Sequence, residues 1–223
     1  MSIKTAIVGL GRMGMRHVEN VRALQLPLVG VCDVSRENLK ASGLPEDLHF
    51  DDFEEMLRIT RPACLIVATT AQAHCPLTCL AAEAGVQYIL CEKPMAVSID
   101  QTRRMIATCL SHNARLAINH PIRYMESYLR PQGLLEAGEF GALSSMSIIA
   151  GNFGIAMNGS HALEAFRFLS GHSPTRIQAW FSGAKTPNPR GPQFDDPAGC
   201  FRVENAAGQR LYVEASGDRK SVV

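Results

Sequence analysis

The chain has 223 residues, of which 46% are hydrophobic and 19% charged, and its formal net charge is +1. This balance is typical of a globular protein with a buried core, and the length allows two modest domains. Because the 22 basic residues are scattered along the chain, we expect no nucleic acid or other polyanion as a partner. The sequence has no apolar run of about 18 residues, so a membrane partner is not expected either.

The cysteines are odd in number, and most lie inside apolar runs such as Val31-Cys32 and Cys64-Leu65-Ile66. That placement is typical of reduced, buried thiols and favours a cytoplasmic location. Cys75 and Cys79 lie one helical turn apart and could share a metal ion, but no second Cys/His pair follows at ligand spacing. We therefore expect core packing at these cysteines and no metal site.

Short apolar runs alternate with helical patterns through the first 119 residues. We expect strands over residues 4–9, 28–32, 48–50, 64–69, 86–91 and 116–119, and helices over 13–26, 35–40, 52–59, 74–84 and 98–112. The strands are almost wholly apolar, as they are when helices cover both faces of a sheet. The alternation predicts an α/β fold, a doubly wound parallel sheet of the Rossmann type.

The pattern changes beyond Asn119. We expect helices over 124–137, with a kink at Pro131, and over 160–169, and strands over 143–152, 175–181, 200–204 and 211–214. A Pro- and Gly-rich loop over 185–199 precedes the last two strands, which a turn at Ala207-Gly208 joins as a hairpin. The sequence thus predicts a dinucleotide-binding domain over residues 1–119 and a shortened α+β domain with a mainly antiparallel sheet over 120–223.

Three glycines, Gly9, Gly11 and Gly14, end the first expected strand and open the first expected helix, with Arg12 and Met13 before the third. Gly9 permits a tight turn, Gly11 lets the backbone touch a pyrophosphate, and Gly14 allows helix and strand to pack closely. The helix N-terminus then offers N–H groups and partial positive charge to the phosphates. Taken alone, the motif is equally compatible with a plain tight turn.

Asp33 ends the second expected strand, 19 residues after Gly14, where a carboxylate can accept both hydroxyls of a ribose. A carboxylate there repels a 2′-phosphate, which favours NAD over NADP. Arg36 is close enough in sequence to soften that preference, although a solvated surface arginine is the favoured interpretation. A Rossmann-like methyltransferase is the competing fold, and it normally has a different glycine pattern.

Glu92-Lys93-Pro94 follows the fifth expected strand. Ligands of doubly wound sheets bind beyond the carboxyl ends of the strands, so we expect Lys93 to point at the cofactor crevice. A lysine held beside a cationic nicotinamide ring has a lowered pKa and becomes a usable proton donor or acceptor. The alternative is an ordinary Glu-Lys pair at the end of a strand.

The glycine motif and Glu92-Lys93-Pro94 belong to a larger set of short motifs along the chain. Together they are Gly-Leu-Gly-Arg-Met-Gly with His17 behind it, Ala68-Thr69-Thr70 with His74, Glu92-Lys93-Pro94, the segment 119–124, and Gly159-Ser160-His161. This set resembles the glucose-fructose oxidoreductase / inositol dehydrogenase / rhizopine-catabolism (Gfo/Idh/MocA) family over roughly residues 3–215. The resemblance implies an NAD-dependent oxidoreductase that acts on a secondary alcohol or ketone of a sugar, a nucleotide sugar or a polyol.

The resemblance also implies roles for individual residues. Lys93 becomes the catalytic lysine, and His161 assists it. Cofactor contacts are expected from Gly9, Gly11, Arg12, Met13, Gly14, Asp33, Ala68, Thr69, Thr70, His74, Glu92 and Lys93. Substrate contacts are expected from Asn119, Arg123, Tyr124 and His161, although Asn119 and Arg123 could instead be structural.

The match departs from the family in two respects. Many members carry Asp-x-Gly-x-His at the start of a helix in the second domain, and here Met157 replaces the aspartate. Glu164 could compensate from the same helical face, or serve as a solvated carboxylate. The chain is also shorter than members of the family usually are. Three explanations are open: a compact variant, a truncated product, or a chain whose sheet another chain completes. Because a half-built sheet leaves an apolar face and an open edge, we expect a homo-oligomer formed through the second-domain sheet.

Two other functions are also compatible with the sequence. A cofactor-binding sensor or regulatory protein without redox turnover would fit the missing aspartate and the short second domain. NAD-assisted cleavage of a glycoside would require the cofactor without consuming it.

Overall fold

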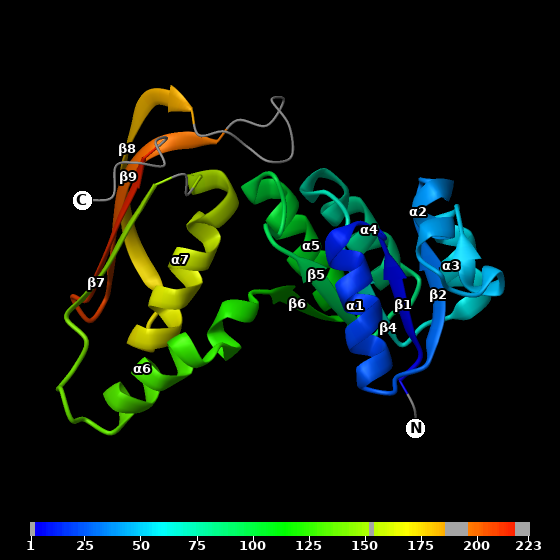
Figure 1. Ribbon diagram of the computed structural model, residues 1–223, viewed down its shortest axis with the longest axis horizontal. Helices are drawn as coiled ribbons and strands as arrows, with labels where there is room; N and C mark the ends of the chain where they lie inside the picture. Colours follow the sequence, from blue (N-terminus) through cyan, green and yellow to red (C-terminus); the bar gives the residue numbers. More distant parts are fainter. Residues whose placement is uncertain (1–2, 152–153, 186–195, 217–223) are drawn as a thin grey trace. The chain divides into compact units, whose positions relative to one another are not determined.

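The computed structural model of the chain describes residues 3–151, 154–185 and 196–216 (Figure 1). The chain divides into two compact units, Met1–Asn119 and His120–Val223. Each unit has its own sheet and its own hydrophobic core.

The first unit is a six-stranded sheet with helices on both faces. Its strands are β1 (Thr5–Val8), β2 (Leu28–Cys32), β3 (His49–Phe50), β4 (Cys64–Val67), β5 (Tyr88–Glu92) and β6 (Arg115–Asn119). Its helices are α1 (Arg12–Ala23), α2 (Arg36–Ala41), α3 (Phe53–Thr60), α4 (Ala71–Glu83) and α5 (Ile99–Ser111), with the short 3₁₀ helix η1 (Glu46–Leu48). The strands lie in the order β3-β2-β1-β4-β5-β6 and every pairing is parallel. The predicted doubly wound sheet is confirmed, and its order reverses between β1 and β4.

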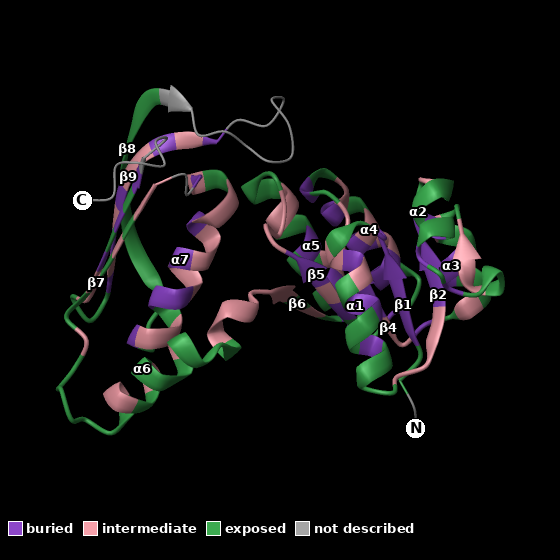
Figure 2. Cartoon of the chain, viewed as in Figure 1, coloured by how far each residue is buried: buried purple, intermediate pink, exposed green. Residues whose placement is uncertain are grey.

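Hydrophobic side chains fill a layer on each face of this sheet, and Figure 2 colours most of β1, β4 and β5 as buried. On one face, residues of β1, β4 and β5 pack against α3, α4 and α5, with Met56, Cys79 and Met105 at the centre. On the other face, Ile7 and Val18 belong to a cluster that joins the sheet to α1 and α2. Burial on both faces explains why these strands read as continuous apolar runs.

Local capping sets the start of several helices in this unit. Ser35 and Ser98 accept hydrogen bonds from the backbone N–H three residues on, and Asp52 does the same for α3. Two helix boundaries differ from prediction by three residues. α1 ends at Ala23 because the chain turns at Gln25, whose φ is 54°, and α4 begins at Ala71 rather than at His74.

The second unit is a four-stranded sheet with one long helix packed on it (Figure 1). Its elements are η2 (Pro121–Tyr124), α6 (Glu126–Glu136), β7 (Ser145–Gly151), α7 (Ile155–Ser170), β8 (Pro174–Lys185), β9 (Pro197–Asn205) and β10 (Arg210–Ser216). The order is β7-β10-β9-β8, with β8, β9 and β10 antiparallel and β10 parallel to β7. The expected mainly antiparallel sheet is confirmed. Of the loop expected over 185–199, residues 186–195 lie outside the described residues.

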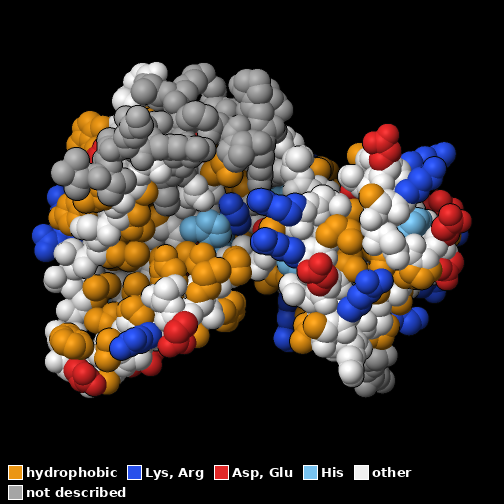
Figure 3. Space-filling model, viewed as in Figure 1, with side chains coloured by type: hydrophobic (Ala, Val, Ile, Leu, Met, Phe, Trp, Pro, Cys, Tyr) orange, Lys and Arg blue, Asp and Glu red, His pale blue; other side chains and the backbone are white. Residues whose placement is uncertain are grey.

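The core of this unit lies between α7 and one face of the sheet, where Phe166 is fully buried against Phe201 and Leu211. Other large hydrophobic side chains remain exposed around α6, and Figure 3 shows hydrophobic surface over this part of the chain. They are Tyr124, Met125, Leu129 and Phe140.

Helix α7 begins at Ile155, earlier than the expected start at Ser160. Gly154 enters the helix with a φ of +61°, and Asp196, which is 1% exposed, caps it from a distant segment. Its Oδ1 accepts a hydrogen bond of 2.7 Å from the backbone N–H of Ala156. His161 therefore lies in the second turn of α7 rather than in its first.

Across the described ranges, no helix has both the length and the apolar character needed to cross a membrane. In the same residues, no three His, Cys, Asp or Glu side chains are grouped so that they could hold a metal ion. Cys75 and Cys79 are 2% and 1% exposed and belong to the core of the first unit.

Candidate functional site

The turn between β1 and α1 is tightly packed at two of its glycines and open at the third. Gly9 has a φ of +90°, and a Cβ there would lie 2.7 Å from the backbone carbonyl of Ala68. A Cβ at Gly14 would overlap the carbonyl oxygen of Gly9, whereas one at Gly11 would meet nothing within 4 Å. The protein's own packing thus requires Gly9 and Gly14, while Gly11 leaves bare backbone facing open space.

The N-terminus of α1 fits an anionic ligand. Gly11 is the N-cap, no side chain caps the helix, and no acidic residue lies in its first turn. The first backbone N–H groups of a helix have no partner within the helix, and they carry partial positive charge. Beside exposed Gly11 and Arg12, this arrangement is suited to a diphosphate.

Asp33 follows β2 and joins the glycine turn to α2. It is 8% exposed; its Oδ2 accepts a hydrogen bond of 2.7 Å from the N–H of Leu10, and its Oδ1 one of 2.8 Å from the N–H of Ser35. The side-chain amide of Asn38 also donates to both oxygens, at 3.3 Å to Oδ1 and 3.2 Å to Oδ2. A carboxylate has about four lone-pair sites, so ribose hydroxyls at Asp33 would replace these longer contacts. Arg36 lies 2.8 Å from Asp51 in an exposed ion pair, so its charge already has a partner.

Glu92 at the end of β5 is the centre of a buried polar network. It is 7% exposed, and its Oε1 accepts hydrogen bonds from His17 Nε2 at 2.8 Å and from Asn119 Nδ2 at 2.7 Å. The backbone N–H of Lys93 lies 3.3 Å from its Oε2. Burial by itself raises the pKa of Glu92, but the hydrogen bonds from His17 and Asn119 outweigh it and hold the pKa below its ordinary value.

Two residues expected to touch ligands therefore use their side chains inside the protein. The carboxylate of Glu92 binds His17, and the amide of Asn119 binds Glu92. In the sequence His17 is only one part of a motif, and its 75-residue separation from Glu92 gives no local signal of this pairing. Glu92 and Asn119 thus fix the backbone at Lys93, because Asn119 binds the Glu92 carboxylate, which in turn accepts a hydrogen bond from the Lys93 N–H.

His74 is 1% exposed and contacts two backbone carbonyls. Its Nδ1 lies 2.8 Å from the carbonyl oxygen of Pro94 and its Nε2 lies 3.2 Å from that of Thr69. We expected His74 to line the cofactor. Its burial favours a supporting role, whereas Ala68, Thr69 and Thr70 are partly or fully exposed at the end of β4.

In the second unit, Arg123 is held by charge and by aromatic rings. Its guanidinium lies 3.1 Å from Glu164, 4.9 Å from the ring centre of Phe168 and 5.7 Å from that of Tyr124. Arg167 also binds Glu164, with two hydrogen bonds of 2.8 Å. The hydrogen bond from Arg167 lowers the pKa of Glu164, and the charges of Arg167 and Arg123 lower it further against the opposing effect of burial.

His161 lies beside a second histidine, His120, which the sequence did not single out. The ring centres of His120 and His161 are 5.4 Å apart, with the planes at 83° in an edge-to-face contact. His120 directly follows β6, whereas His161 is on α7, so the pair depends on the fold of the second unit.

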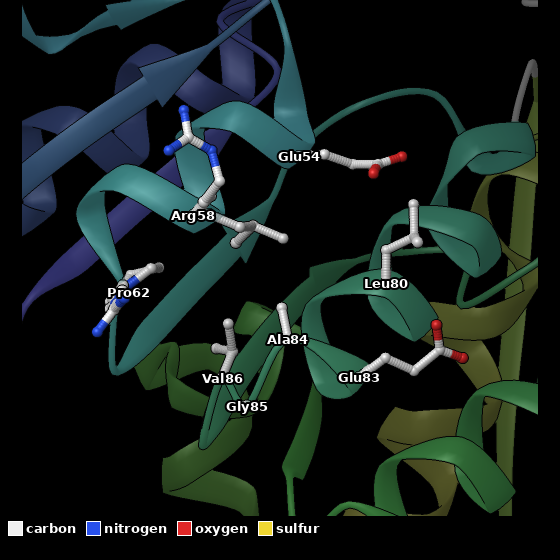
Figure 4. A pocket seen from close by; sticks show the side chains of 10 residues that line it. Glu54, Arg58, Pro62, Leu80, Glu83, Ala84, Gly85 and Val86 are labelled. Carbon is white, nitrogen blue, oxygen red and sulfur yellow. The ribbon is translucent and has the colours of Figure 1, made fainter.

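One surface hollow of the first unit lies away from the glycine turn. It has a volume of about 440 Å³ and lies between α3 and α4, where Pro62 and Val86 precede β4 and β5. Figure 4 shows Glu54 on one wall and Leu80 and Glu83 on the other. Because the hollow is at the amino ends of the strands, it is separate from the crevice that ligands of doubly wound sheets occupy.

The Glu92 network makes stability depend on pH. In Glu92→Gln the shape is kept and the charge removed, and we expect the free energy of unfolding at pH 7 to fall by about 1–3 kcal/mol. Since the folded-state pKa is below the ordinary value of 4.5, the carboxylate's contribution is complete above that pH and is lost as the pH falls through the folded value.

Urea unfolding of both proteins at pH 7, 5 and 3.5 measures this effect. The difference between them should shrink toward acid pH, and a difference that stays constant would contradict the assignment. Glu54→Gln, which alters an exposed carboxylate, is the matched control and should change little at any pH.

The first unit matches a known protein family. The sequence profile described as "Oxidoreductase family, NAD-binding Rossmann fold" matches residues 3–120. A D-apiose dehydrogenase of Paraburkholderia graminis is 29% identical over 195 residues, which cover 79% of this chain and 52% of that protein. An inositol 2-dehydrogenase of Salmonella typhimurium is 25% identical over 147 residues, covering 63% and 44%. The chain spans about half the length of these curated relatives.

Solved structures share the fold at lower identity. The WlbA dehydrogenase of Bordetella pertussis, in complex with NADH and UDP-GlcNAcA, has a TM-score of 0.84 at 19% identity, covering 99% of this chain and 72% of that one. GenD2 from gentamicin A biosynthesis, in complex with NAD, has a TM-score of 0.82 at 22% identity, covering 97% and 66%. At such identities these structures support the fold alone. Because the family profile covers more than half of the chain, this protein belongs to the Gfo/Idh/MocA family of oxidoreductases with an NAD-binding Rossmann fold.

Proposed function

We propose that this protein is an NAD-dependent dehydrogenase or reductase that interconverts a secondary alcohol and a ketone on a sugar, a nucleotide sugar or a polyol. The observation that carries the proposal is the bare backbone of Gly11 at the uncapped N-terminus of α1. Its relatives include proteins named D-apiose dehydrogenase and inositol 2-dehydrogenase, which supports a carbohydrate substrate.

The residues of the first unit fit a dinucleotide. We propose that Gly9, Gly11, Arg12, Met13 and Gly14 hold the diphosphate at the start of α1. Asp33 would accept hydrogen bonds from the adenosine ribose, and Ala68, Thr69 and Thr70 would lie along the nicotinamide side. The Asp33 carboxylate and the pairing of Arg36 with Asp51 both favour NAD over NADP. The carboxylate would repel a 2′-phosphate, and Arg36, the basic residue nearest Asp33 along the chain, already has an acidic partner.

In the proposed mechanism Lys93 accepts or donates the proton of the substrate hydroxyl. Bound NAD supplies C4 of the nicotinamide as the acceptor of the hydride. In the oxidising direction, Nζ of neutral Lys93 would take the proton of the substrate hydroxyl while the carbinol C–H bond breaks. The electron pair of that C–H bond would leave with the hydrogen as hydride. The O–H electrons then form the carbonyl, and protonated Lys93 releases its proton to water. Reduction reverses each of these transfers.

The second unit is proposed to bind the substrate. His161 would hydrogen-bond a substrate hydroxyl or share its proton, with His120 against its ring. Arg123 and Tyr124 would position the carbohydrate. Contacts with Glu164 and Phe168 fix the Arg123 side chain, so its positive charge has a defined position.

A sensor that binds NAD without turnover is the second candidate, and Met157 in place of the family's aspartate is the observation that favours it. A protein of this kind would bind NAD tightly and form no NADH with any member of a panel of sugars, nucleotide sugars and polyols. Turnover with any one of them excludes the sensor.

We propose a cytoplasmic location from the state of the thiols. All the cysteines are unpaired in the structure. Burial raises the pKa of the Cys32 and Cys91 thiols to about 12, which keeps them protonated and unreactive. Reduced thiols in a core are typical of a reducing compartment.

We also propose that two copies of the chain associate through the sheet of the second unit. The sheet face opposite α7 exposes Ile149 at 64%, Trp180 at 54% and Tyr212 at 38%. These residues line part of a shallow hollow of about 380 Å³. Grouped apolar exposure of this kind marks an interaction surface.

The first prediction of the proposed function compares substitutions of two glycines in the turn. Gly11→Ala should leave the melting temperature unchanged and weaken NAD binding by about tenfold or more, because its Cβ would project into the space that a diphosphate needs. Gly14→Ala should instead destabilise or unfold the protein, since its Cβ would overlap Gly9. Calorimetric titration and thermal unfolding measure the two effects. Equal NAD affinity in Gly11→Ala and wild type would refute the cofactor site.

The second prediction concerns Lys93. Lys93→Met keeps the aliphatic stem and removes the amine, and kcat should fall by about 10²–10⁴-fold while NAD affinity stays within about twofold. Stopped-flow measurement of NADH formation with the best substrate of the panel provides kcat. Lys40→Met, at an exposed position, is the control, and wild-type kcat in Lys93→Met would show that the proton passes elsewhere.

The third prediction concerns association. Trp180 is the only tryptophan, so its emission should shift to longer wavelength on dilution as the proposed interface separates. Ile149→Glu should sediment as a monomer, whereas Ile177→Glu, also exposed but on the α7 side of the sheet, should retain the wild-type state. A wild-type protein that is monomeric at micromolar concentration would overturn the proposal.

A further inference from the structure

The hydrogen-bonded ladder between β4 and β5 stops before the segments that the proposed function uses. Its last paired residues are Val67 and Cys91. Thr69 lies two residues beyond Val67 and Pro94 three beyond Cys91, so sheet bonds no longer hold these two segments together. One of them would face the cofactor, and the other carries Lys93.

His74 bridges this gap. It is on the first turn of α4, is 1% exposed, and presents one ring nitrogen to each segment. Nδ1 lies 2.8 Å from the carbonyl oxygen of Pro94, and Nε2 lies 3.2 Å from that of Thr69. A carbonyl only accepts, so each contact is a hydrogen bond when the ring nitrogen that faces it carries a proton, and a neutral ring, with one N–H, donates to one carbonyl at a time. In either case the planar ring, packed between the two carbonyls, fixes the spacing of the two segments.

We infer that His74 is a positioning residue whose two ring nitrogens set two different properties of the site. The Nε2 contact holds the turn at Thr69 for the cofactor, and the Nδ1 contact holds the Lys93-Pro94 segment for proton transfer. The kinetic part of this inference rests on the proposed function. A residue that only fills the core would affect both properties alike.

Two substitutions separate the nitrogens, because the amide of Asn reaches about the place of Nδ1 and the amide of Gln about the place of Nε2. His74→Asn keeps the donor toward Pro94, so kcat should stay within about threefold while the Kd for NAD rises about tenfold. His74→Gln keeps the donor toward Thr69, so the Kd should stay within about threefold while kcat falls about tenfold.

The matched controls are His112→Asn and His112→Gln. His112 is exposed at the end of α5, and its Nδ1 lies 3.0 Å from the carbonyl oxygen of Thr108. Neither control should change kcat or Kd by more than about twofold, because His112 touches no part of the proposed site. Equal changes of kcat and Kd in the two His74 variants would overturn the inference.

Amide hydrogen exchange of the protein without NAD tests the same division independently of activity. His74→Asn should speed exchange around Thr69 and Thr70, and His74→Gln around Lys93 and Met95. Should the exchange divide in this way while the wild type binds no NAD, the bridge stands and the proposed function fails. Uniformly faster exchange of both segments in both variants would overturn the inference.

The wild type provides a measurement even if neither variant folds. Nitrogen-15 NMR of the histidine rings should find a His74 N–H proton that exchanges with water far more slowly than that of His112. Exchange as fast as in His112 would show that the bridge does not persist in solution and would overturn the inference.

Discussion

The close approach of α1 to β1 is the constraint on which the rest of the site depends. Gly14 lies so near the carbonyl of Gly9 that a Cβ there would overlap its oxygen. This contact sets where the helix begins, and so places its uncapped N–H groups beside Gly11. Asp33 then fixes the turn through the N–H of Leu10. Protein contacts account for Gly9 and Gly14 but not for Gly11, and what distinguishes Gly11 from the other open glycines is its place as the N-cap of α1.

The same constraint extends to Lys93 through a buried charge. Removing a carboxylate from water costs several kcal/mol unless it is paired and hydrogen-bonded. Glu92 meets that requirement with His17 from α1 and Asn119 from β6. Because His17 is on the helix whose position Gly14 sets, the glycine turn and the Lys93 segment belong to one connected structure. A shift of α1 would disturb both ends of the proposed reaction, cofactor and proton donor alike.

The sequence was sufficient for the features that local chemistry decides. Alternating apolar runs predicted the parallel sheet, and the helices expected to start near residues 35 and 98 do so, with Ser35 and Ser98 as their caps. It was insufficient where a partner lies far along the chain. The cap that Asp196 gives to α7 comes from 40 residues away, so the early start of that helix and the place of His161 in its second turn were missed. The contact of His161 with His120 has the same origin.

The surroundings of Glu164 bear on the replacement of the family's aspartate by Met157. Glu164 lies between Arg123 and Arg167, and the hydrogen bond from Arg167 lowers its pKa. A carboxylate held in two ion pairs accepts a proton poorly at neutral pH, so it is a weak substitute for the missing acid. In the proposed reaction the proton transfer then falls mainly on Lys93. That reliance gives a physical reason for the bonds around its segment, where Glu92 fixes one side and His74 the other.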